Sequence, residues 1–310
     1  MMNIAESITS LIGATPLVRL RNAVGSDDCI VAAKLEQFNP GGSVKDRAAL
    51  AMVNDAERTG RLGTGGTIIE ATSGNMGIAV AMVAAARGYR ACIVMPETMS
   101  VERRMLLTAY GAEIVLTPAH LGMRGSIDKA TELAREIPGS VVIGQFDNPA
   151  NPAMHEQTTA KEIIDDTDGK IDIFIAGAGT GGTVTGVGKV LKAYNPAIKI
   201  VAVEPQNSNV LSGGSGGPHL IQGLGPGFIP SVFDRTVVDE VITVSDQDAY
   251  LWTGRIVSTQ GILAGISSGA ALCATAQYIE RFSPHNALIV TLFPDTGERY
   301  LSIPQLFRDH

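Results

Sequence analysis

The chain has 310 residues, 45% of them hydrophobic, which is enough for the cores of one large or two ordinary globular domains. Its formal net charge is −7 and its basic residues are dispersed, which argues against a nucleic-acid-binding protein. The N-terminal stretch has no basic region, and the longest apolar run, Ile78 to Ala86, is too short to span a membrane. We therefore expect a cytoplasmic protein that acts on small molecules.

Short apolar segments alternate with longer helical patterns through most of the chain, which predicts parallel sheets flanked by helices. The first set of predicted strands covers residues 67–71, 91–95, 113–116 and 141–145. Helices are predicted at 76–87 and 101–110, closed by Gly88 and Gly111 respectively. These elements are expected to form one sheet with its helices.

A second set of elements follows after residue 152. The predicted strands are 171–176, 198–204, 241–244 and 287–293, and the predicted helices are 183–194, 246–260 and 268–282. The segment DNPANP at 147–152 separates the two sets, and its turn-forming composition marks a place where the chain passes from one domain to the other. Ligands of open parallel sheets bind beyond the carboxyl ends of the strands, which is where the polar turns of this sequence fall.

Three cysteines and five histidines show no spacing typical of a metal or disulfide site. Cys29, Cys92 and Cys273 are isolated and odd in number, so we predict that each is a core residue. No two histidines lie four residues apart, and no metal is expected.

The stretch GAGTGGT at 177–183 lies between a predicted strand and a predicted helix. Such a turn presents backbone N–H groups and the positive end of a helix, which favours a phosphate group. Gly177, Gly179 and Gly182 also satisfy the G-x-G-x-x-G pattern of dinucleotide-binding folds, and Glu204 ends the next predicted strand. A tight turn without a ligand is the third alternative, and these residues alone do not decide among the three.

A lysine follows the turn NPGG at 39–42, near the start of a predicted helix with Ser43 as its expected cap. A cation in the first turn opposes the helix dipole by about 0.3–1 kcal/mol, so this position favours the neutral amine of Lys45. A neutral amine is what imine chemistry requires, although a solvated lysine paired with Asp46 or Glu36 is the alternative. A phosphate loop and such a lysine in one chain together indicate pyridoxal phosphate.

Seven motifs carry a resemblance to a known family: IGATPLVRL, NPGGSVKDR, TSGNMG, GAGTGGTVTGVG, GPHLIQGLGPGFIP, GILAGISSGAA and GERYLS. They run from residue 12 to residue 302 and resemble the cysteine synthases, or O-acetylserine sulfhydrylases, pyridoxal-phosphate enzymes of the tryptophan-synthase-β class. The resemblance implies an α/β fold of type II with two domains, each a mostly parallel twisted sheet flanked by helices. The smaller domain would cover 43–148, the larger one 1–42 and 149–310, with the cofactor in the cleft between them.

The resemblance also assigns roles to single residues. Lys45 resembles the lysine that binds the cofactor as an imine and removes the substrate α-proton. Asn75 resembles the partner of the cofactor 3-hydroxyl, and Ser267 that of the pyridine nitrogen. The phosphate loop would be Gly179, Thr180, Gly181, Gly182 and Thr183, and the substrate carboxylate would be held by Thr72, Ser73, Asn75 and Gln145.

Two positions depart from the family pattern. Met76 stands where relatives usually have threonine, so it is expected to contribute only a backbone N–H to substrate binding. Asp295 stands where many relatives have serine, and we interpret it as a turn or cap residue.

The resemblance makes the turn 72–75 a predicted carboxylate site, because a helix N-terminus and two hydroxyl groups offer donors to an anion. A capped turn without function is the alternative.

The implied reaction is β-replacement in cysteine biosynthesis, in which sulfide replaces the acetate of O-acetyl-L-serine. The resemblance further implies a homodimer and, in some relatives, a cleft that binds the C-terminal tail of serine acetyltransferase. Three alternatives remain open: thioether formation from serine and homocysteine, as in cystathionine β-synthases; a nicotinamide-dependent oxidoreductase built on the glycine pattern; and a non-enzymatic relative that acts as a binding partner. In cystathionine β-synthases an acidic residue stands where this chain has Gly227.

Overall fold

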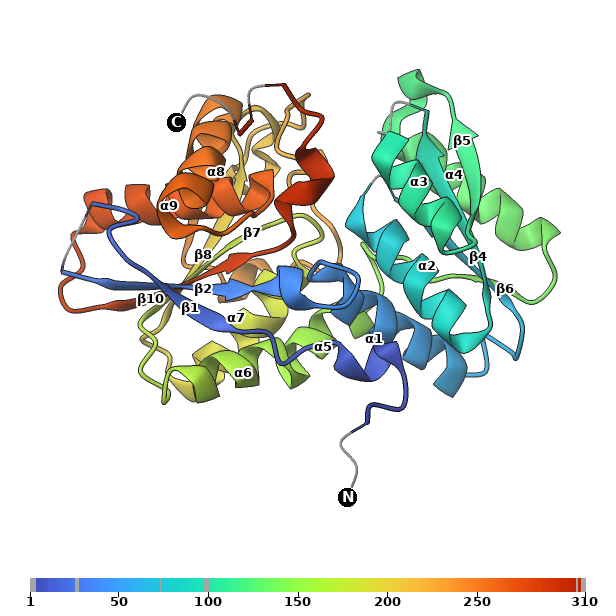
Figure 1. Ribbon diagram of the computed structural model, residues 1–310, viewed down its shortest axis with the longest axis horizontal. Coiled ribbons are helices and arrows are strands. Elements are labelled where there is room, and N and C mark those ends of the chain that lie inside the picture. Colours follow the sequence, from blue (N-terminus) through green and yellow to red (C-terminus); the bar gives the residue numbers. More distant parts are fainter. Residues whose placement is uncertain (1–3, 26–27, 73, 98–100, 305, 308–310) are drawn as a thin grey trace. The chain divides into compact units, whose positions relative to one another are not determined.

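The computed structural model describes residues 4–25, 28–72, 74–97, 101–304 and 306–307, the side chains of 101 and 102 excepted. The chain forms two compact units, Met1–Ile12 with Asn39–Asn151 and Gly13–Phe38 with Pro152–His310 (Figure 1). Each unit is a sheet flanked by helices, which confirms the predicted fold class. The domain limits expected from the sequence, 43–148 against 1–42 and 149–310, stay a prediction. No helix in the described ranges is both long and apolar enough to cross a bilayer.

The first unit contains a four-stranded, fully parallel sheet in the order β5-β4-β3-β6. Its strands are β3 (Thr67–Ala71), β4 (Arg90–Pro96), β5 (Glu113–Thr117) and β6 (Ser140–Val142), and its helices are α1 (Lys45–Arg58), α2 (Asn75–Arg87), α3 (Val101–Ala109) and α4 (Gly122–Glu136). The four predicted strands are confirmed, but the last is shorter than expected. The chain turns at Gly144, with φ 63°, so Gln145 lies in a turn and not in a strand.

Helices cover both faces of this sheet, which explains why its strands are apolar at nearly every position. Ile68 and Ile93 pack on the side of α1 and α2, whereas Ile69 and Val94 pack toward α4. Glu70 is the exception in β3, because it carries an ionisable carboxyl group and yet is only 1% exposed. Figure 1 shows α4 on the opposite side of the sheet from α2.

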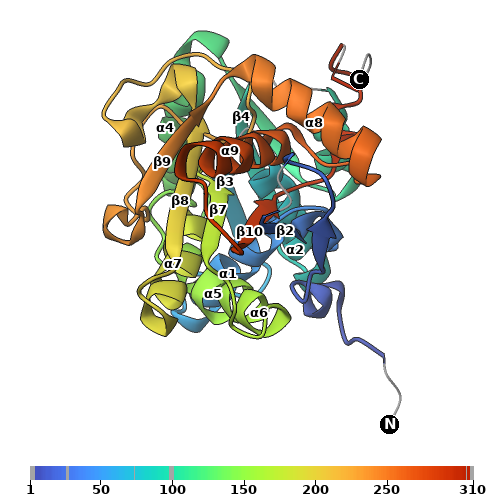
Figure 2. The ribbon, with the colours of Figure 1, turned by 90° about the vertical axis from the view of Figure 1, so that its left-hand side faces the viewer.

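The second unit contains a six-stranded sheet in the order β1-β2-β10-β7-β8-β9. Its strands are β1 (Leu17–Leu20), β2 (Ile30–Leu35), β7 (Ile173–Gly177), β8 (Lys199–Pro205), β9 (Glu240–Val244) and β10 (Leu288–Phe293). Only β1, at one edge, is antiparallel to its neighbour. The helices α8 (Asp246–Gln260) and α9 (Ile266–Phe282) lie on one face, and α6 (Thr159–Asp166) and α7 (Gly182–Tyr194) lie on the other (Figure 2).

Several elements differ from the expectation. The strands β1 and β2 and the helices α5 (Ala150–Gln157) and α6 were not predicted. The helix α4 lies between β5 and β6, where a helix was expected without stated bounds. Pro152 lies in the first turn of α5, where its missing N–H has no intrahelical partner to lose, so DNPANP ends inside a helix.

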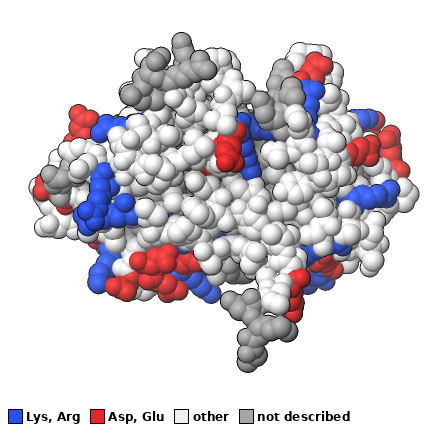
Figure 3. Space-filling view, viewed as in Figure 1, with Lys and Arg blue, Asp and Glu red and all other residues white. Residues whose placement is uncertain are grey.

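On the face shown in Figure 3, Lys and Arg side chains lie in separate groups among Asp and Glu.

Candidate active site

Two turns lie at the same edge of the first unit's sheet, because they follow the carboxyl ends of the neighbouring parallel strands β3 and β6. The first leads into α2. The buried Thr72 donates its N–H to the Val94 carbonyl at 3.0 Å, and its Oγ1 accepts from the Gly74 N–H at 3.2 Å. Asn75 is the first residue of α2. Ser73, predicted to bind the substrate carboxylate, lies outside the described residues.

Met76 occupies the first turn of α2, and its side chain is 1% exposed. It belongs to the apolar cluster that α1 and α2 form with the sheet. The Met76 side chain therefore packs in the core. This agrees with the expectation that Met76 contributes only its backbone N–H to substrate binding. That contribution itself stays a prediction.

The second turn carries Gln145, which is 5% exposed. Two asparagines fix its backbone: the Asn148 amide donates to the Ile143 carbonyl at 2.8 Å, and the Asn151 amide donates to the Gln145 carbonyl at 2.9 Å. The turn thus holds Gln145 in one place at the edge of the sheet, near the turn that carries Thr72.

The side chain of Glu70 contacts this second turn. This contact was not predicted from the sequence. The Glu70 Oε2 accepts from the Gly144 N–H at 3.0 Å. Burial raises the pKa of Glu70 to about 8; the hydrogen bond from the Gly144 N–H opposes the rise, and the charge of Asp147 adds to it. The sequence feature that could have indicated Glu70 is a single carboxyl group in the otherwise apolar strand β3.

Lys45 is the first residue of α1 and is partly buried. The preceding turn is closed by the Gly42 N–H, which donates to the Asn39 carbonyl at 2.7 Å, and by the Gly41 N–H, which donates to the Asp46 carboxylate at 2.5 Å. The prediction that Ser43 caps the helix was wrong in position, since the cap is Val44. The Ser43 hydroxyl nevertheless accepts from the Lys45 N–H at 3.3 Å.

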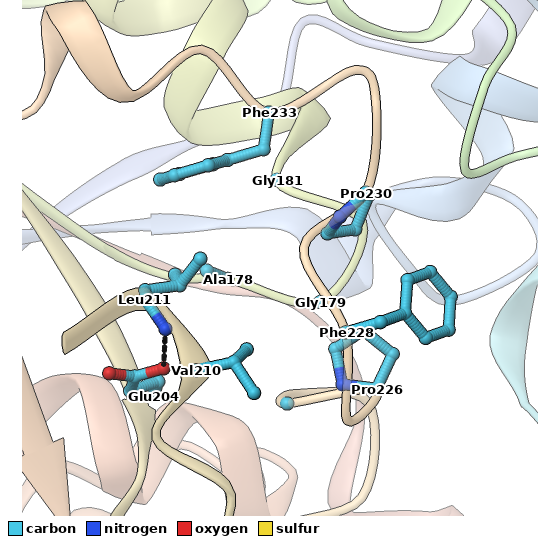
Figure 4. Close-up of a pocket in the computed structure, with 11 residues that line it drawn as sticks. Ala178, Gly179, Gly181, Glu204, Val210, Leu211, Pro226, Phe228, Pro230 and Phe233 are labelled. Carbon is cyan, nitrogen blue, oxygen red and sulfur yellow. Dashed lines mark hydrogen bonds between the residues drawn. The ribbon is translucent and has the colours of Figure 1, made fainter. Parts of the chain in front are cut away.

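The glycine loop of the second unit connects β7 to α7. Gly181 is the N-cap of α7 with φ 80°, a conformation that favours glycine. A Cβ atom at Gly179 would collide with the Gly223 carbonyl oxygen, and one at Gly181 would collide with Phe233, whose ring lies beside it in Figure 4. The loop therefore exposes backbone at a helix N-terminus, which fits a phosphate group.

A histidine that no sequence motif indicated supports this loop. Thr183 Oγ1 lies 3.2 Å from Nε2 of His155, and Nδ1 of His155 lies 2.8 Å from Thr159 Oγ1. His155 is 2% exposed. A fixed imidazole thus orients the hydroxyl group at the end of the predicted phosphate loop.

The dinucleotide alternative fails at Glu204, the residue that would bind a ribose. Its carboxylate accepts from the Leu211 N–H at 2.8 Å (Figure 4), and from the Ser212 N–H at 2.9 Å and the Ser212 hydroxyl at 2.6 Å. Glu204 is 1% exposed. It fixes the segment after β8 and offers no free carboxylate to a ligand.

The segment 223–230 passes beside the glycine loop. The Gly225 N–H donates to the Ala178 carbonyl at 3.1 Å, and Pro226, Phe228 and Pro230 line a small pocket together with Gly179 and Gly181 (Figure 4). Gly227 has φ 87°, so any other residue here would be strained.

Ser267 lies in the first turn of α9 and is 4% exposed. The turn before α9 is hydrogen-bonded to the segment after β10, because the Gly265 N–H donates to the Asp295 carbonyl at 3.0 Å. Asp295 is buried and accepts from the Tyr300 hydroxyl at 2.6 Å. Asp295 was interpreted as a turn or cap residue; it is not the cap, since Thr296 caps the following 3-10 helix, Gly297–Tyr300.

The three cysteines are buried, as predicted. Burial raises the pKa of Cys92 to about 11 and that of Cys273 to about 12. Both groups are thus neutral thiols and poor nucleophiles near neutral pH.

Known proteins resemble this chain in both sequence and structure. Residues 8–295 match the profile of the family described as "Pyridoxal-phosphate dependent enzyme". A cysteine synthase of Staphylococcus aureus is 54% identical over 300 residues, which are 96% of either chain. The structure resembles an O-ureido-L-serine synthase (TM-score 0.95, 48% identity, 99% and 96% coverage) and a cysteine synthase of Entamoeba histolytica (TM-score 0.94, 43% identity, 99% and 97% coverage).

Proposed function

Because the chain belongs to the cysteine synthase family of pyridoxal-phosphate dependent enzymes, we propose that it makes L-cysteine from O-acetyl-L-serine and sulfide by β-replacement. The observation that carries the proposal is that one chain holds both a glycine loop at the N-terminus of α7 and a partly buried lysine at the start of α1. The loop fits the phosphate of pyridoxal phosphate, and the lysine amine suits its aldehyde.

The cofactor, when bound, supplies an electron sink that allows the α-proton and the β-substituent of an amino acid to leave. Lys45 would hold it and, as a neutral amine, would take the α-proton of the substrate. Residues 179–183 would bind its phosphate, Asn75 would bind its 3-hydroxyl, and Ser267 would offer a neutral hydroxyl group to its ring.

The substrate carboxylate is held at the edge of the first unit's sheet. Thr72 comes from the turn before α2, Asn75 is the first residue of α2, and Gln145 comes from the turn after β6. Ser73 is assigned to the same group from its motif alone, since it lies outside the described residues. The α2 N-terminus adds backbone N–H groups, among them that of Met76. Donors from two neighbouring turns can reach the two oxygens of one carboxylate, which orients the amino acid for removal of its α-proton.

Replacing Gln145 with alanine is expected to weaken substrate binding and leave the cofactor in place. Loss of a hydrogen bond to a charged group, about 1.5–3 kcal/mol, raises the O-acetylserine concentration for half-saturation by roughly ten- to a hundredfold. The measurement is a titration of the visible absorbance of the purified enzyme with O-acetylserine. Gln247→Ala, at an exposed position of α8, is the control. A wild-type half-saturation in Gln145→Ala would remove Gln145 from the carboxylate site.

The alternative reaction, thioether formation from serine and homocysteine, requires hydroxide to leave. A nearby acid assists such a poor leaving group by typically about a hundred- to ten-thousandfold, whereas acetate needs no such help. Gly227 cannot supply a proton, and its φ of 87° disfavours any side chain at this position. The loop 223–230 therefore favours O-acetylserine as the first substrate.

The assembly of the protein is a further part of the proposal. We infer from the resemblance of the motifs that the chain forms a homodimer, that 43–148 is the smaller domain, and that a serine acetyltransferase tail binds in the substrate cleft. Light scattering of the purified protein tests the dimer. Competition between a C-terminal acetyltransferase peptide and O-acetylserine tests the tail.

A further inference from the structure

A buried imidazole joins two threonine hydroxyl groups behind the glycine loop. His155, in α5, is 2% exposed. Its Nδ1 lies 2.8 Å from Oγ1 of Thr159, the first residue of α6, and its Nε2 lies 3.2 Å from Oγ1 of Thr183, in the first turn of α7. Gly186 brings α7 close to α5, since an added Cβ would collide with the Pro152 carbonyl oxygen and the His155 side chain. The ring is thus held in place between the two hydroxyl groups.

The two hydroxyl groups differ in their surroundings. Thr159 is fully buried, and within the described ranges its hydroxyl group makes a hydrogen bond to His155 alone. A buried hydroxyl proton needs an acceptor, so the O–H of Thr159 is expected to donate to Nδ1. Thr183 is only half-buried and is accessible to a ligand at the N-terminus of α7.

The position of the ring proton follows from the direction of the first of these hydrogen bonds. A neutral imidazole has one N–H and one bare nitrogen. When Nδ1 accepts from Thr159, the ring proton lies on Nε2, and Nε2 donates to Oγ1 of Thr183. The Thr183 hydroxyl group then keeps its own proton for a different acceptor. The opposite tautomer would draw that proton toward His155 and leave only lone pairs for a ligand.

We propose that His155 is a positioning residue whose Nε2–H tautomer, fixed by Thr159, directs the Thr183 hydroxyl proton to the phosphate group of the cofactor. A phosphate group near neutral pH is mostly a dianion, so a hydroxyl group stabilises it only as a donor. Selection of one tautomer thus makes Thr183 a donor to phosphate. The inference rests on the proposed function, since it assumes that residues 179–183 bind that phosphate.

The direct test is the tautomer of His155 in the holoenzyme. Nitrogen NMR spectra of the protein with isotope-labelled histidine distinguish a ring nitrogen that carries a proton from one that does not. The His155 signals are assigned by their loss in His155→Gln. We expect the proton on Nε2 and a bare Nδ1. A proton on Nδ1 in the wild-type holoenzyme would overturn the inference.

Thr159→Val keeps the shape of the side chain and removes the group that fixes the tautomer. We expect the dissociation constant of pyridoxal phosphate to rise by about two- to tenfold, the effect of one hydrogen bond between neutral groups. The measurement is an absorbance titration of the full-length chain after removal of its cofactor. Thr167→Val is the matched control at the other end of α6, where the hydroxyl group donates to the Ile163 carbonyl at 2.7 Å, and is expected to bind as the wild type does. Wild-type binding in Thr159→Val would contradict the inference.

A third variant separates the inference from the phosphate loop on which it rests. Thr183→Val removes the donor itself and is expected to raise the dissociation constant by about ten- to a hundredfold, since the lost bond is to a charged group. Thr159→Val/Thr183→Val is expected to bind no more weakly than Thr183→Val alone, and full additivity would count against a role through His155.

The failures of the two proposals give different results in these titrations. If Thr183→Val weakens binding and Thr159→Val does not, the phosphate loop stands and the role of His155 falls. Unchanged binding in Thr183→Val would remove Thr183 from the phosphate site and overturn both. Because no amino-acid substrate enters the titrations, an enzyme with a different reaction would give the same results.

Discussion

Lys45→Ala is expected to lose turnover by at least about a thousandfold, because one amine both anchors the cofactor and removes the α-proton. Borohydride reduction of the wild-type protein followed by peptide mapping is expected to place the cofactor on Lys45. Circular dichroism checks that the variant folds. Lys170→Ala, which removes an exposed lysine beside Asp168, is expected to keep wild-type activity.

Two results would contradict this role for Lys45. One is full turnover of the alanine variant, and the other is attachment of the cofactor to another lysine after reduction. Lys45→Arg makes the test sharper, because it keeps the positive charge of a solvated lysine but cannot form the imine. An active arginine variant would mean that Lys45 acts only through its charge.

Gly181→Ala is expected to cost most of the bound cofactor and part of the stability. Gly181 has φ 80°, and an added Cβ would collide with Phe233. A side chain here would occupy the space of the phosphate. The structure adds two further reasons, backbone strain and collision with the core, so even alanine is expected to disturb the loop. Cofactor content is measured by visible absorbance per chain, and stability by thermal unfolding.

A matched glycine separates strain from collision. Gly213 has φ 87° in the same unit, and an added Cβ would have no atom within 4 Å. Gly213→Ala therefore costs only the left-handed backbone penalty, about 1–2 kcal/mol, and is expected to keep its cofactor. Equal cofactor content and equal unfolding temperatures in the two variants would contradict the assignment of the phosphate loop.

The sequence predicted the elements whose pattern is local. The strands β3, β4 and β5 and the helices α2 and α8 agree with expectation within one or two residues, since each is a continuous apolar or periodic segment ended by glycine or polar residues. The strand β1 was missed, because it is a four-residue edge strand that is exposed at two positions and shows no clear alternation.

The residues that support the site could not be predicted in this way. Glu70 contacts a turn 74 residues away, and His155 contacts a threonine 28 residues away, so their roles depend on which strands and helices become neighbours. The same holds for Glu204, whose spacing favoured a dinucleotide site until its hydrogen bonds to Leu211 and Ser212 were seen. Local motifs thus indicated the binding groups, and tertiary contacts identified what holds them.

In the proposed reaction the protein joins sulfide to the carbon skeleton of O-acetyl-L-serine. The most direct test is kcat/KM for O-acetylserine with sulfide against serine with homocysteine, measured on the same cofactor-loaded preparation with product identification. We expect L-cysteine from the first pair, and far slower formation of cystathionine from the second, because Gly227 offers no acid to assist hydroxide. A higher kcat/KM for serine with homocysteine would contradict it.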